Sequence, residues 1–478
     1  MTTSTASPFI NALRTKDALT ENGMTTNSTS LNACTDLFFI LWAMRGQDTD
    51  RLQRHVSSAW NEDRQTALRT LFWGRDVRGW AGERQVFKDS LTYLIAHDKN
   101  GVIKKNIQHI PEYGRRDDLM VFMNTPYEKD VLELIKQWLE DKNALCAKWM
   151  DRQWNNFHKV RKYMNIPSST YRKLLVELSK TVEQKMASWE WSQIEYGKLP
   201  SLASARYQKA FLKNDADRYT TYKEWLQNGT EKINASAVYP YDVIKSLKFG
   251  DTVVAEAQWM ALPNYLKESN RRILPMCDVS ESMEDEDNKI GWNDNLYPMD
   301  VCISLWLYIS ERNVWPFQNA FITFTDVPTL QYVTWSLSER LEQMKWNKWY
   351  NTDLKLAFTT LLNRAKEENI APEDMPTDIL ILSDMEFDDS HIDWINPTAQ
   401  EMIKHEYENA WYTMPNIIYW NLQSRDDNMP VKFDEQWTAL VSGFSPAIIQ
   451  ALLVWDDMTP VGIMNKQVNS ERYEKIVA

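Results

Sequence analysis

Three oxygen-bearing side chains alternate directly after a short apolar segment of this sequence. Asp278, Ser280 and Ser282 follow the apolar residues 273–277, which read Ile-Leu-Pro-Met-Cys. In an extended backbone every second side chain points the same way, so these three oxygens would converge. Burying hard oxygens at the end of a strand is costly unless a positive charge lies close to them. The pattern therefore predicts a divalent cation site.

Two further oxygen side chains occur where a parallel sheet would bring them to the same edge. Thr352 opens a predicted helix in WYNTDLKLAF, and Asp384 ends the strand-like segment ILILSD. In a doubly wound sheet, ligands gather at the carboxyl ends of the strands where the strand order reverses. Mg²⁺ takes roughly octahedral oxygen ligands and keeps several waters. The predicted ligands of Mg²⁺ or another divalent cation are Asp278, Ser280, Ser282, Thr352 and Asp384.

Together these elements resemble the metal-ion-dependent adhesion site of the von Willebrand factor A domain, whose pattern is DxSxS, a distant Thr and a distant Asp. The resemblance implies direct coordination by Ser280 and Ser282, with the Asp residues acting through water and Thr352 in either way. An open position on the metal would accept a carboxylate or phosphate oxygen of a partner. Glu281, where many members have Gly, or the acidic segment 284–295 could occupy that position instead. The alternative is that the two serines only satisfy backbone groups in a tight turn.

The elements that must position these residues change in type along the chain. The second half alternates short apolar strand-like segments, such as TDILILSDMEF, with helical segments, which predicts an α/β doubly wound sheet. The first half consists of amphipathic helical segments of about 15 residues, which favours a helical repeat of the HEAT or armadillo kind. Residues 1–250 carry 37 Lys and Arg against 29 Asp and Glu, whereas the remaining residues carry 17 against 37. We therefore predict two domains, residues 1–265 and residues 266–478.

Composition narrows the classes of function. No segment approaches the roughly 18 apolar residues of a membrane span, and the first twenty residues do not resemble a leader. The cysteines show neither disulfide nor zinc spacing, so a reduced, cytoplasmic protein is expected. No motif such as HExxH, GxSxG or GxxxxGK[ST] occurs, and we therefore expect no enzyme.

Segments of the first half resemble the TROVE module of the Ro autoantigen family and its Ro-like relatives. The resemblance rests on LTENGMTTNSTSLNACTDLFFILWAMRG, LFWGRDVRGWAGERQVF and IPEYGRRDDLMVF, with DMEFD in the second half. At Arg116 relatives often carry an aromatic residue. The family implies a monomeric ring of helical repeats closed by the A domain, which binds structured or misfolded non-coding RNA in the cytoplasm.

Cations interleaved with aromatic residues are the chemistry that RNA binding needs, because cations neutralise phosphates and aromatic rings stack on bases. The candidate RNA-binding residues are Arg75, Arg78, Arg84, Arg115, Arg116, Lys148, Lys159, Arg161, Lys162, Arg172 and Lys173. Because acidic residues alternate with Arg78 and Arg84, the cations of residues 75–84 could instead form structural ion pairs. The same alternative stays open for residues 148–163.

Three hypotheses follow. The first is a Ro-like protein that binds non-coding RNA, whose A domain closes the ring and offers a Mg²⁺ site to a protein partner. The second is an adhesion or scaffold module that captures an acidic residue of a partner through Mg²⁺, without RNA. The third is a phosphoryl-transfer enzyme or hydrolase that uses Asp278 and Asp384 with Mg²⁺. The sequence does not decide which RNA is bound, whether the metal site is loaded, or whether a nuclease is recruited.

Overall fold

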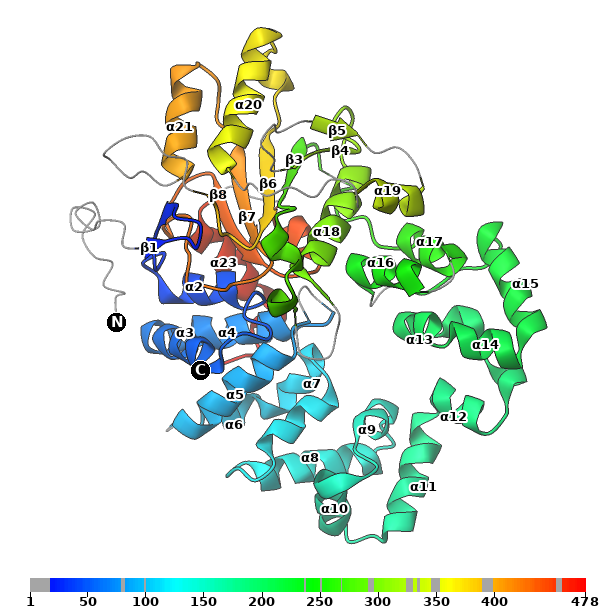
Figure 1. Ribbon diagram of the computed structural model, residues 1–478. Coiled ribbons are helices and arrows are strands. Elements are labelled where there is room, and N and C mark those ends of the chain that lie inside the picture. Colours follow the sequence, from blue (N-terminus) through cyan, green and yellow to red (C-terminus); the bar gives the residue numbers. More distant parts are fainter. Residues whose placement is uncertain are drawn as a thin grey trace. The chain divides into compact units, whose positions relative to one another are not determined.

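The structure is a computed structural model of the 478-residue chain, shown in Figure 1. It describes residues 18–78, 82–98, 100–235, 238–249, 252–267, 269–290, 296–323, 330–332, 336–344, 353–388, 399–452 and 458–478. The chain divides into two compact units. The sheet unit comprises Met1–Thr70, Tyr239–Tyr241 and Asn264–Glu471, and the helical unit comprises Leu71–Val238, Asp242–Pro263 and Arg472–Ala478.

The sheet unit is built on a mixed six-stranded sheet, in which the strand order is β5-β4-β3-β6-β7-β8. The strands are β3 (Ile273–Cys277), β4 (Ala320–Thr323), β5 (Leu330–Tyr332), β6 (Asp378–Ser383), β7 (Asn416–Asn421) and β8 (Thr438–Ser442). All neighbouring pairs are parallel except β4 with β5. Every residue of β3, β4, β6 and β8 is buried, which is typical of a sheet covered on both faces. The predicted α/β half is therefore confirmed at the level of a mixed, mostly parallel sheet.

The sheet order reverses beside β3. The chain proceeds from β3 outward to β4 and β5, then returns to the other side of β3 with β6 and continues to β7 and β8. Such a reversal leaves a crevice at the carboxyl ends of the two strands that flank it, here β3 and β6. Cys277 pairs with Leu382, so the two strands end at nearly the same level.

Helices that follow the strands complete the sheet unit. They are α18 (Pro298–Arg312), α19 (Leu337–Met344), α20 (Leu354–Glu367), α21 (Ala399–Asn409), α22 (Ala447–Leu452) and α23 (Pro460–Val468). Short 3₁₀ turns η5 (Glu281–Glu284) and η6 (Glu286–Asn288) lie between β3 and α18, and η7 (Pro372–Asp374) lies between α20 and β6. The capping oxygen of α20 comes from Asp353, whose side chain accepts a hydrogen bond from the Leu356 amide. That cap fixes where the helix begins, because the first turn of a helix leaves amide hydrogens without intrahelical partners.

The first described residues of the chain belong to the sheet unit and not to the helical unit. They form the strand pair β1 (Ala18–Leu19) and β2 (Thr25–Thr26) and the helices α2 (Ala33–Ile40) and α3 (Thr49–Glu62). Helix α2 packs on β8, where Ser442 Oγ donates to the Phe38 carbonyl at 3.4 Å. The division into units therefore differs from the two predicted domains. The described residues up to Thr70, which were predicted to belong to the first domain, are part of the sheet unit. Periodicity predicts a helix, but it does not say which core that helix joins.

The helical unit confirms the predicted helical character of this half. Helix α4 (Arg64–Arg75) begins in the sheet unit and ends in the helical unit, since the division falls between Thr70 and Leu71. It is followed by α5 (Gln85–His97), α6 (Val102–Asn106), α7 (Ile110–Tyr113), α8 (Glu128–Glu140), α9 (Ala144–Trp149), α10 (Trp154–Tyr163), α11 (Ser168–Ser179), α12 (Val182–Ala187), α13 (Ser201–Arg206), α14 (Gln208–Asn214), α15 (Ala216–Gln227), α16 (Pro240–Phe249), whose first two residues also belong to the sheet unit, and α17 (Thr252–Met260). The 3₁₀ turns are η1 (Ile107–His109), η2 (Arg116–Phe122), η3 (Trp191–Gln193) and η4 (Tyr196–Lys198), with η8 (Glu471–Tyr473) near the C-terminus. The repeat type and the ring remain predictions.

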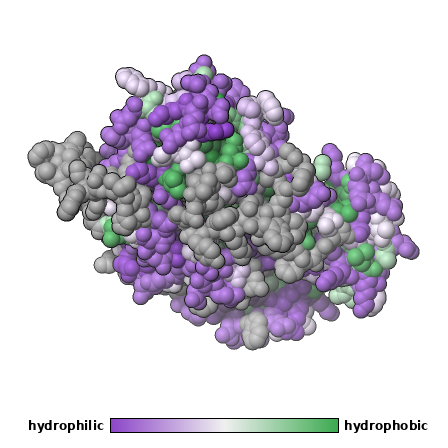
Figure 2. Space-filling view, turned by 45° about the horizontal axis from the view of Figure 1, so that its top comes forward, coloured by the Kyte–Doolittle hydropathy of each residue, from purple (hydrophilic) through white to green (hydrophobic). Residues whose placement is uncertain are grey.

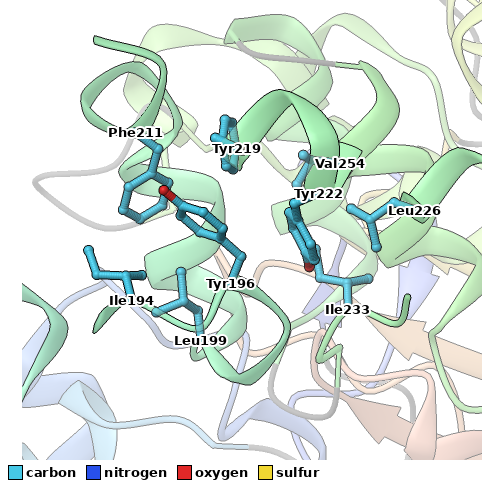
Figure 3. Close-up of a cluster of buried hydrophobic side chains, with 9 residues drawn as sticks. All are labelled: Ile194, Tyr196, Leu199, Phe211, Tyr219, Tyr222, Leu226, Ile233 and Val254. Atoms are coloured by element: carbon cyan, nitrogen blue, oxygen red, sulfur yellow. The ribbon is translucent and has the colours of Figure 1, made fainter. Parts of the chain in front are cut away.

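Aromatic residues form much of one core of the helical unit. Tyr196, Phe211, Tyr219 and Tyr222 cluster with aliphatic side chains from η3 to α17 (Figure 3). The rings of Tyr196 and Tyr219 meet edge to face with their centroids 5.0 Å apart, an arrangement that aromatic pairs favour. This cluster fixes the segment from residue 194 to residue 199 in place.

The face drawn in Figure 2 is mostly hydrophilic, with hydrophobic residues in small groups. None of the helices that the structure describes is both long and apolar enough for a membrane crossing.

Candidate functional site

The register of β3 and β6 brings the two halves of the predicted cation site together. Asp278 is the first residue after β3, and Ser383 is the last residue of β6. The Asp278 amide donates to the Leu382 carbonyl at 3.0 Å, and Ser383 Oγ donates to Asp278 Oδ2 at 2.6 Å. Asp384 follows immediately, so both carboxylates lie in the crevice where the strand order reverses.

The two serines connect these carboxylates. The Ser280 amide donates to Asp278 Oδ1 at 3.0 Å, which turns the chain back after the strand. The hydroxyl oxygens of Ser280 and Ser282 are 3.0 Å apart, and Ser282 Oγ donates to Asp384 Oδ2 at 3.1 Å. Asp278, Ser280, Ser282 and Asp384 therefore form one cluster, as the spacing predicts, whereas Thr352 lies outside the described residues.

Burial gives the cluster an unusual electrostatic state. The Asp278 side chain is fully buried, and Asp384 is 1% exposed. Burial and the neighbouring Asp384 carboxylate raise the pKa of Asp278 to about 7, although hydrogen bonds from Ser383 and Ser280 act in the opposite direction. Two neighbouring carboxylates that are both shielded from water favour a bound proton or cation beside them.

An arginine from the next strand supplies part of the missing positive charge. Arg425 follows β7, and its Nη2 lies 2.7 Å from Asp384 Oδ2 while its Nη1 lies 2.5 Å from Glu21 Oε2. Burial opposes the charged guanidinium, but Asp384 and Glu21 outweigh it and raise the pKa of Arg425. Arg425 and Glu21 were not among the predicted site residues. The one signal in the sequence that could have identified Arg425 is its position shortly after the strand-like segment that forms β7, the neighbour of β6.

Glu386 adds a third carboxylate beside the cluster. Its Oε2 accepts a hydrogen bond from the Glu21 amide at 2.6 Å, and its Oε1 accepts one from Asn428 Nδ2 at 2.8 Å. Burial raises the pKa of Glu386 to about 7. In the sequence, DMEFD stood out only through its family resemblance, and Glu386 was not a predicted site residue. The signal for it is its position two residues after Asp384, because alternate residues of an extended chain point the same way.

The oxygen atoms of the cluster suit a hard divalent cation. Ligands at right angles around Mg²⁺, each about 2.0–2.1 Å from the metal, are about 2.9 Å from one another. The separations of 3.0 Å between the serine oxygens and 3.1 Å between Ser282 Oγ and Asp384 Oδ2 are close to that value. Across the described ranges, no three His, Cys, Asp or Glu side chains gather as a metal-binding group. Any cation here would depend on hydroxyl ligands.

The acidic residues after the serines lie outside this cluster where the structure describes them. Glu281 is exposed at the start of η5, and Glu286 forms an ion pair with Lys289 and accepts a hydrogen bond from the Tyr297 hydroxyl. The Asn288 side chain donates to the Ser282 carbonyl at 2.8 Å, which holds the loop against the cluster. Residues 291–295 of the acidic segment lie outside the described residues.

Several predicted RNA-binding cations belong to a buried ion-pair network in the helical unit. Arg75 is 1% exposed and lies 2.7 Å from Asp118 Oδ2 through its Nη2. Arg84 contacts Asp117 at 2.6 Å and Asp118 at 2.8 Å, and Arg115 contacts Asp117 at 2.5 Å. The geometry of Arg75 and Arg84 therefore favours the structural alternative over RNA contact.

Three other candidate cations have partners within the helical unit. Arg78 is exposed and donates to the Glu112 carbonyl at 2.9 Å. Arg116 stacks over the Trp138 ring at 5.3 Å, and burial lowers its pKa. Lys159 lies 2.5 Å from Glu128 Oε2. Each of these contacts competes with a phosphate for the cation.

The remaining candidates are less committed. Lys148 lies 5.1 Å from the Trp149 ring, and Arg161 Nε lies 3.3 Å from His158 Nδ1. Lys162, Arg172 and Lys173 are exposed on α10 and α11, and Arg172 lies over the Phe157 ring at 5.1 Å. These exposed side chains are the part of the predicted RNA surface that the structure leaves accessible.

Comparisons with known proteins place the chain in a family. Residues 20–167 and 150–271 match the domain of unknown function DUF2828, and residues 272–476 match the domain of unknown function DUF7788. The chain is also similar to "Uncharacterized protein L728" of Acanthamoeba polyphaga mimivirus, with 26% identity over 509 residues, covering 94% of this chain and 86% of that protein. Since the DUF2828 match covers more than half of the chain, the protein belongs to the DUF2828 family.

Proposed function

We propose that this member of the DUF2828 family binds a partner through a divalent cation held at the carboxyl ends of β3 and β6. In this proposal the sheet unit is an A domain of the von Willebrand factor type. The strand order with its reversal at β3 supports the assignment, because it places the DxSxS segment and Asp384 at one crevice. Binding, not catalysis, is the proposed activity.

The observation that carries the proposal is the continuous contact from Ser280 through Ser282 to Asp384. The two hydroxyl oxygens would bind the cation, while Asp278 and Asp384 would orient ligands or act through water, since both accept hydrogen bonds within the cluster. Neutral hydroxyl ligands leave much of the metal's charge uncompensated. The bound Mg²⁺ would therefore attract a carboxylate or phosphate oxygen of the partner.

Arg425 sets a condition on this function. Its guanidinium contacts the same Asp384 Oδ2 that lies beside Ser282. A divalent cation next to this oxygen repels the guanidinium, so loading the site requires Arg425 to share Asp384 or to turn toward Glu21. We therefore propose that Arg425 balances the charge of the cluster when the cation is absent.

Isothermal titration of the purified chain with Mg²⁺ and with Mn²⁺ tests the proposal. We expect one saturable site, and we expect Ser282→Ala to weaken binding at least about tenfold, because it removes a ligand oxygen worth roughly 1.4 kcal/mol or more. Ser470→Ala is the matched control, since Ser470 Oγ donates only to the Gln467 carbonyl in the same unit. Equal affinity of the two variants would refute the assigned ligands.

RNA binding by the helical unit is a second candidate, in the manner of the Ro-like proteins and their ring of HEAT-like repeats. The observation that favours it is the exposed group Lys162, Arg172 and Lys173, near which no carboxylate among the described residues lies within ion-pair distance. Cations without carboxylate partners are free to neutralise phosphates.

An electrophoretic shift with single-tailed structured RNA at about 50 and 200 mM salt tests this candidate. We expect the triple change of Lys162, Arg172 and Lys173 to Gln to reduce both the affinity and its salt dependence. Changing Lys104 to Gln is the control, because its ammonium group is already paired with the Asp130 carboxylate at 3.0 Å. Absence of binding at the lower salt concentration would remove RNA from the account.

A further inference from the structure

A cavity of about 780 Å³ within the helical unit is lined mainly by positive side chains. Its lining includes seven Lys or Arg residues and two Glu residues. The cations come from separate segments, from the turn before η2 to α13. Those used below are Arg115, Lys148, Arg152, Lys180, Lys185 and Arg206.

Two of these cations are held by neutral groups. Arg152 Nη2 donates to Ser179 Oγ at 2.9 Å, and Lys185 Nζ donates to the Gln193 carbonyl at 2.8 Å. For Lys148, Lys180 and Arg206, no carboxylate of the described chain lies within ion-pair distance. Neutral acceptors orient a cation without cancelling its charge, so the repulsion among these groups remains.

The two glutamates of the lining cancel only part of this charge, and the charge of Lys148 acts on Glu183. Glu195 Oε2 lies 2.5 Å from Lys198 Nζ, which also lines the cavity. Glu183 Oε1 accepts a hydrogen bond from the Tyr207 hydroxyl at 2.9 Å. Even with Arg115 paired to Asp117, the cavity keeps an excess of positive charge.

An unpartnered hydroxyl provides an independent sign of a ligand. Ser201 lines the cavity and is only 2% exposed, yet among the described residues its Oγ has no hydrogen-bond partner. A buried polar atom without a partner is uncommon in native proteins and indicates a missing ligand or water. A phosphate oxygen would accept a hydrogen bond from the Ser201 hydroxyl.

The walls of the cavity are rigid enough to serve as a binding site. Ile194 and Leu199 line it and also belong to the buried cluster of Figure 3, so this wall is part of a packed core. On another wall, the Arg115 guanidinium lies 3.6 Å from the centre of the Trp149 ring. A site that is ordered before binding loses little entropy when the ligand arrives.

We propose that this cavity binds a compact small molecule carrying several phosphate groups, such as a nucleoside triphosphate or an inositol polyphosphate. The cations come from several segments around one partly open hollow, which suits a compact polyanion better than a strand that runs along a surface. The volume also lies within the roughly 300–1,000 Å³ of ordinary ligand pockets. Its lining shares no residue with the proposed cation site or with the exposed group Lys162, Arg172 and Lys173.

Calorimetric titration of the full chain tests the proposal, with adenosine triphosphate, inositol hexakisphosphate and inorganic phosphate as probes. EDTA is present so that a divalent cation contributes nothing. We expect one saturable site for at least one of the two polyphosphates, with inorganic phosphate much weaker. The preferred probe distinguishes a nucleotide from an inositol phosphate.

Two cavity variants are safe for folding. Lys180 ends α11 with a positive φ of 41°, so Lys180→Gly removes the charge at a position where glycine is favoured. Arg206 is exposed, and Arg206→Gln replaces its charge with a neutral polar group. Each change should weaken polyphosphate binding about tenfold, the value of one charge-assisted hydrogen bond. Lys209→Gln and Lys213→Gln, at exposed positions of α14 that do not line the cavity, should leave the affinity unchanged.

Three results would overturn the proposal. Inorganic phosphate that binds as tightly as the polyphosphates would mean an adventitious ion only. Equal losses in the cavity and control variants would mean a general effect of surface charge. A single-stranded RNA oligonucleotide whose binding depends on Lys180 and Arg206, with no polyphosphate binding, would assign the cavity to RNA.

Discussion

Two buried aspartates show opposite behaviour in the two units. Asp118 of the helical unit and Asp278 of the sheet unit are both fully buried. Burial acts against the charge of Asp118, but Arg75 and Arg84 outweigh it and lower its pKa. Burial and Asp384 instead raise the pKa of Asp278 to about 7.

The difference lies in how the surrounding residues balance charge. Asp118 receives two guanidinium groups and the Arg115 amide, so its charge is fully compensated within the fold. Among the residues that the structure describes, Asp278 receives only hydroxyl and amide donors, and the nearby Arg425 contacts Asp384 instead. A cluster whose negative charge is compensated by arginines stabilises the fold. A cluster whose negative charge is not fully compensated can instead bind a cation from solution.

The largest effect is expected at the compensated cluster. Arg75→Ala leaves Asp118 buried with only the partly exposed Arg84 as a cation, so we expect the free energy of unfolding to fall by about 3–5 kcal/mol. Urea denaturation of the wild type and of Arg75→Ala measures this difference in the free energy of unfolding. Lys104→Ala, which breaks an exposed pair with Asp130, is the control and should cost no more than about 1 kcal/mol. If the two variants lose the same amount, the Asp118 network is not structural.

A smaller effect is expected at the undercompensated cluster. The raised pKa of Asp278 means that the folded protein binds a proton more tightly than the unfolded chain. Without a cation, this contribution to stability is complete below about pH 4 and is lost as the pH rises through about 7. Asp278→Asn, which mimics the neutral form, should therefore be at least as stable as the wild type at pH 8.

Thermal unfolding at pH 5 and pH 8, with EDTA and then with Mg²⁺, measures this prediction. We expect Mg²⁺ to raise the melting temperature of the wild type at pH 8 and to leave that of the Asp278→Asn variant unchanged. A loss of several kcal/mol in this variant at pH 8 would make Asp278 a structural residue like Asp118, and the contrast between the two would disappear.

The smallest effect is expected for Glu281, which lies between the two serines but is exposed. Glu281→Gln should change the unfolding free energy by no more than about 0.5 kcal/mol and leave Mg²⁺ affinity unchanged. Calorimetry measures the affinity. Tighter Mg²⁺ binding would instead show that Glu281 occupies the open position of the metal, which the sequence leaves as an alternative.

Local patterns in the sequence predict much of the sheet unit. The apolar segments that became β3, β4, β6 and β7 are recognisable, and alternation alone groups Asp278 with Ser280 and Ser282. The strands β5 and β8 were not predicted: β5 has only three residues, none of them buried, and β8 begins and ends on a polar residue, Thr438 and Ser442. The contact between Asp384 and Ser282 depends on strand order, which a resemblance could suggest but periodicity could not.

Contacts between distant segments are what the sequence cannot provide. Arg75 and Asp118 meet because two helical segments pack together, and Arg425 reaches Asp384 because β7 lies next to β6. For the same reason, the sequence of α2 did not indicate that this helix packs on β8. The charged residues near the RDVRG segment are equally compatible with an RNA-binding surface and with an ion-pair network. Only the partners of each guanidinium group distinguish the two.

The most direct test of the cation site is a crystal structure grown with saturating Mn²⁺, recorded for anomalous scattering. The account predicts one strong anomalous peak bonded to the hydroxyl oxygens of Ser280 and Ser282, with Arg425 drawn away from Asp384. Crystals that contain Mn²⁺ in the solvent but show no peak there, with Arg425 still paired to Asp384, would contradict it.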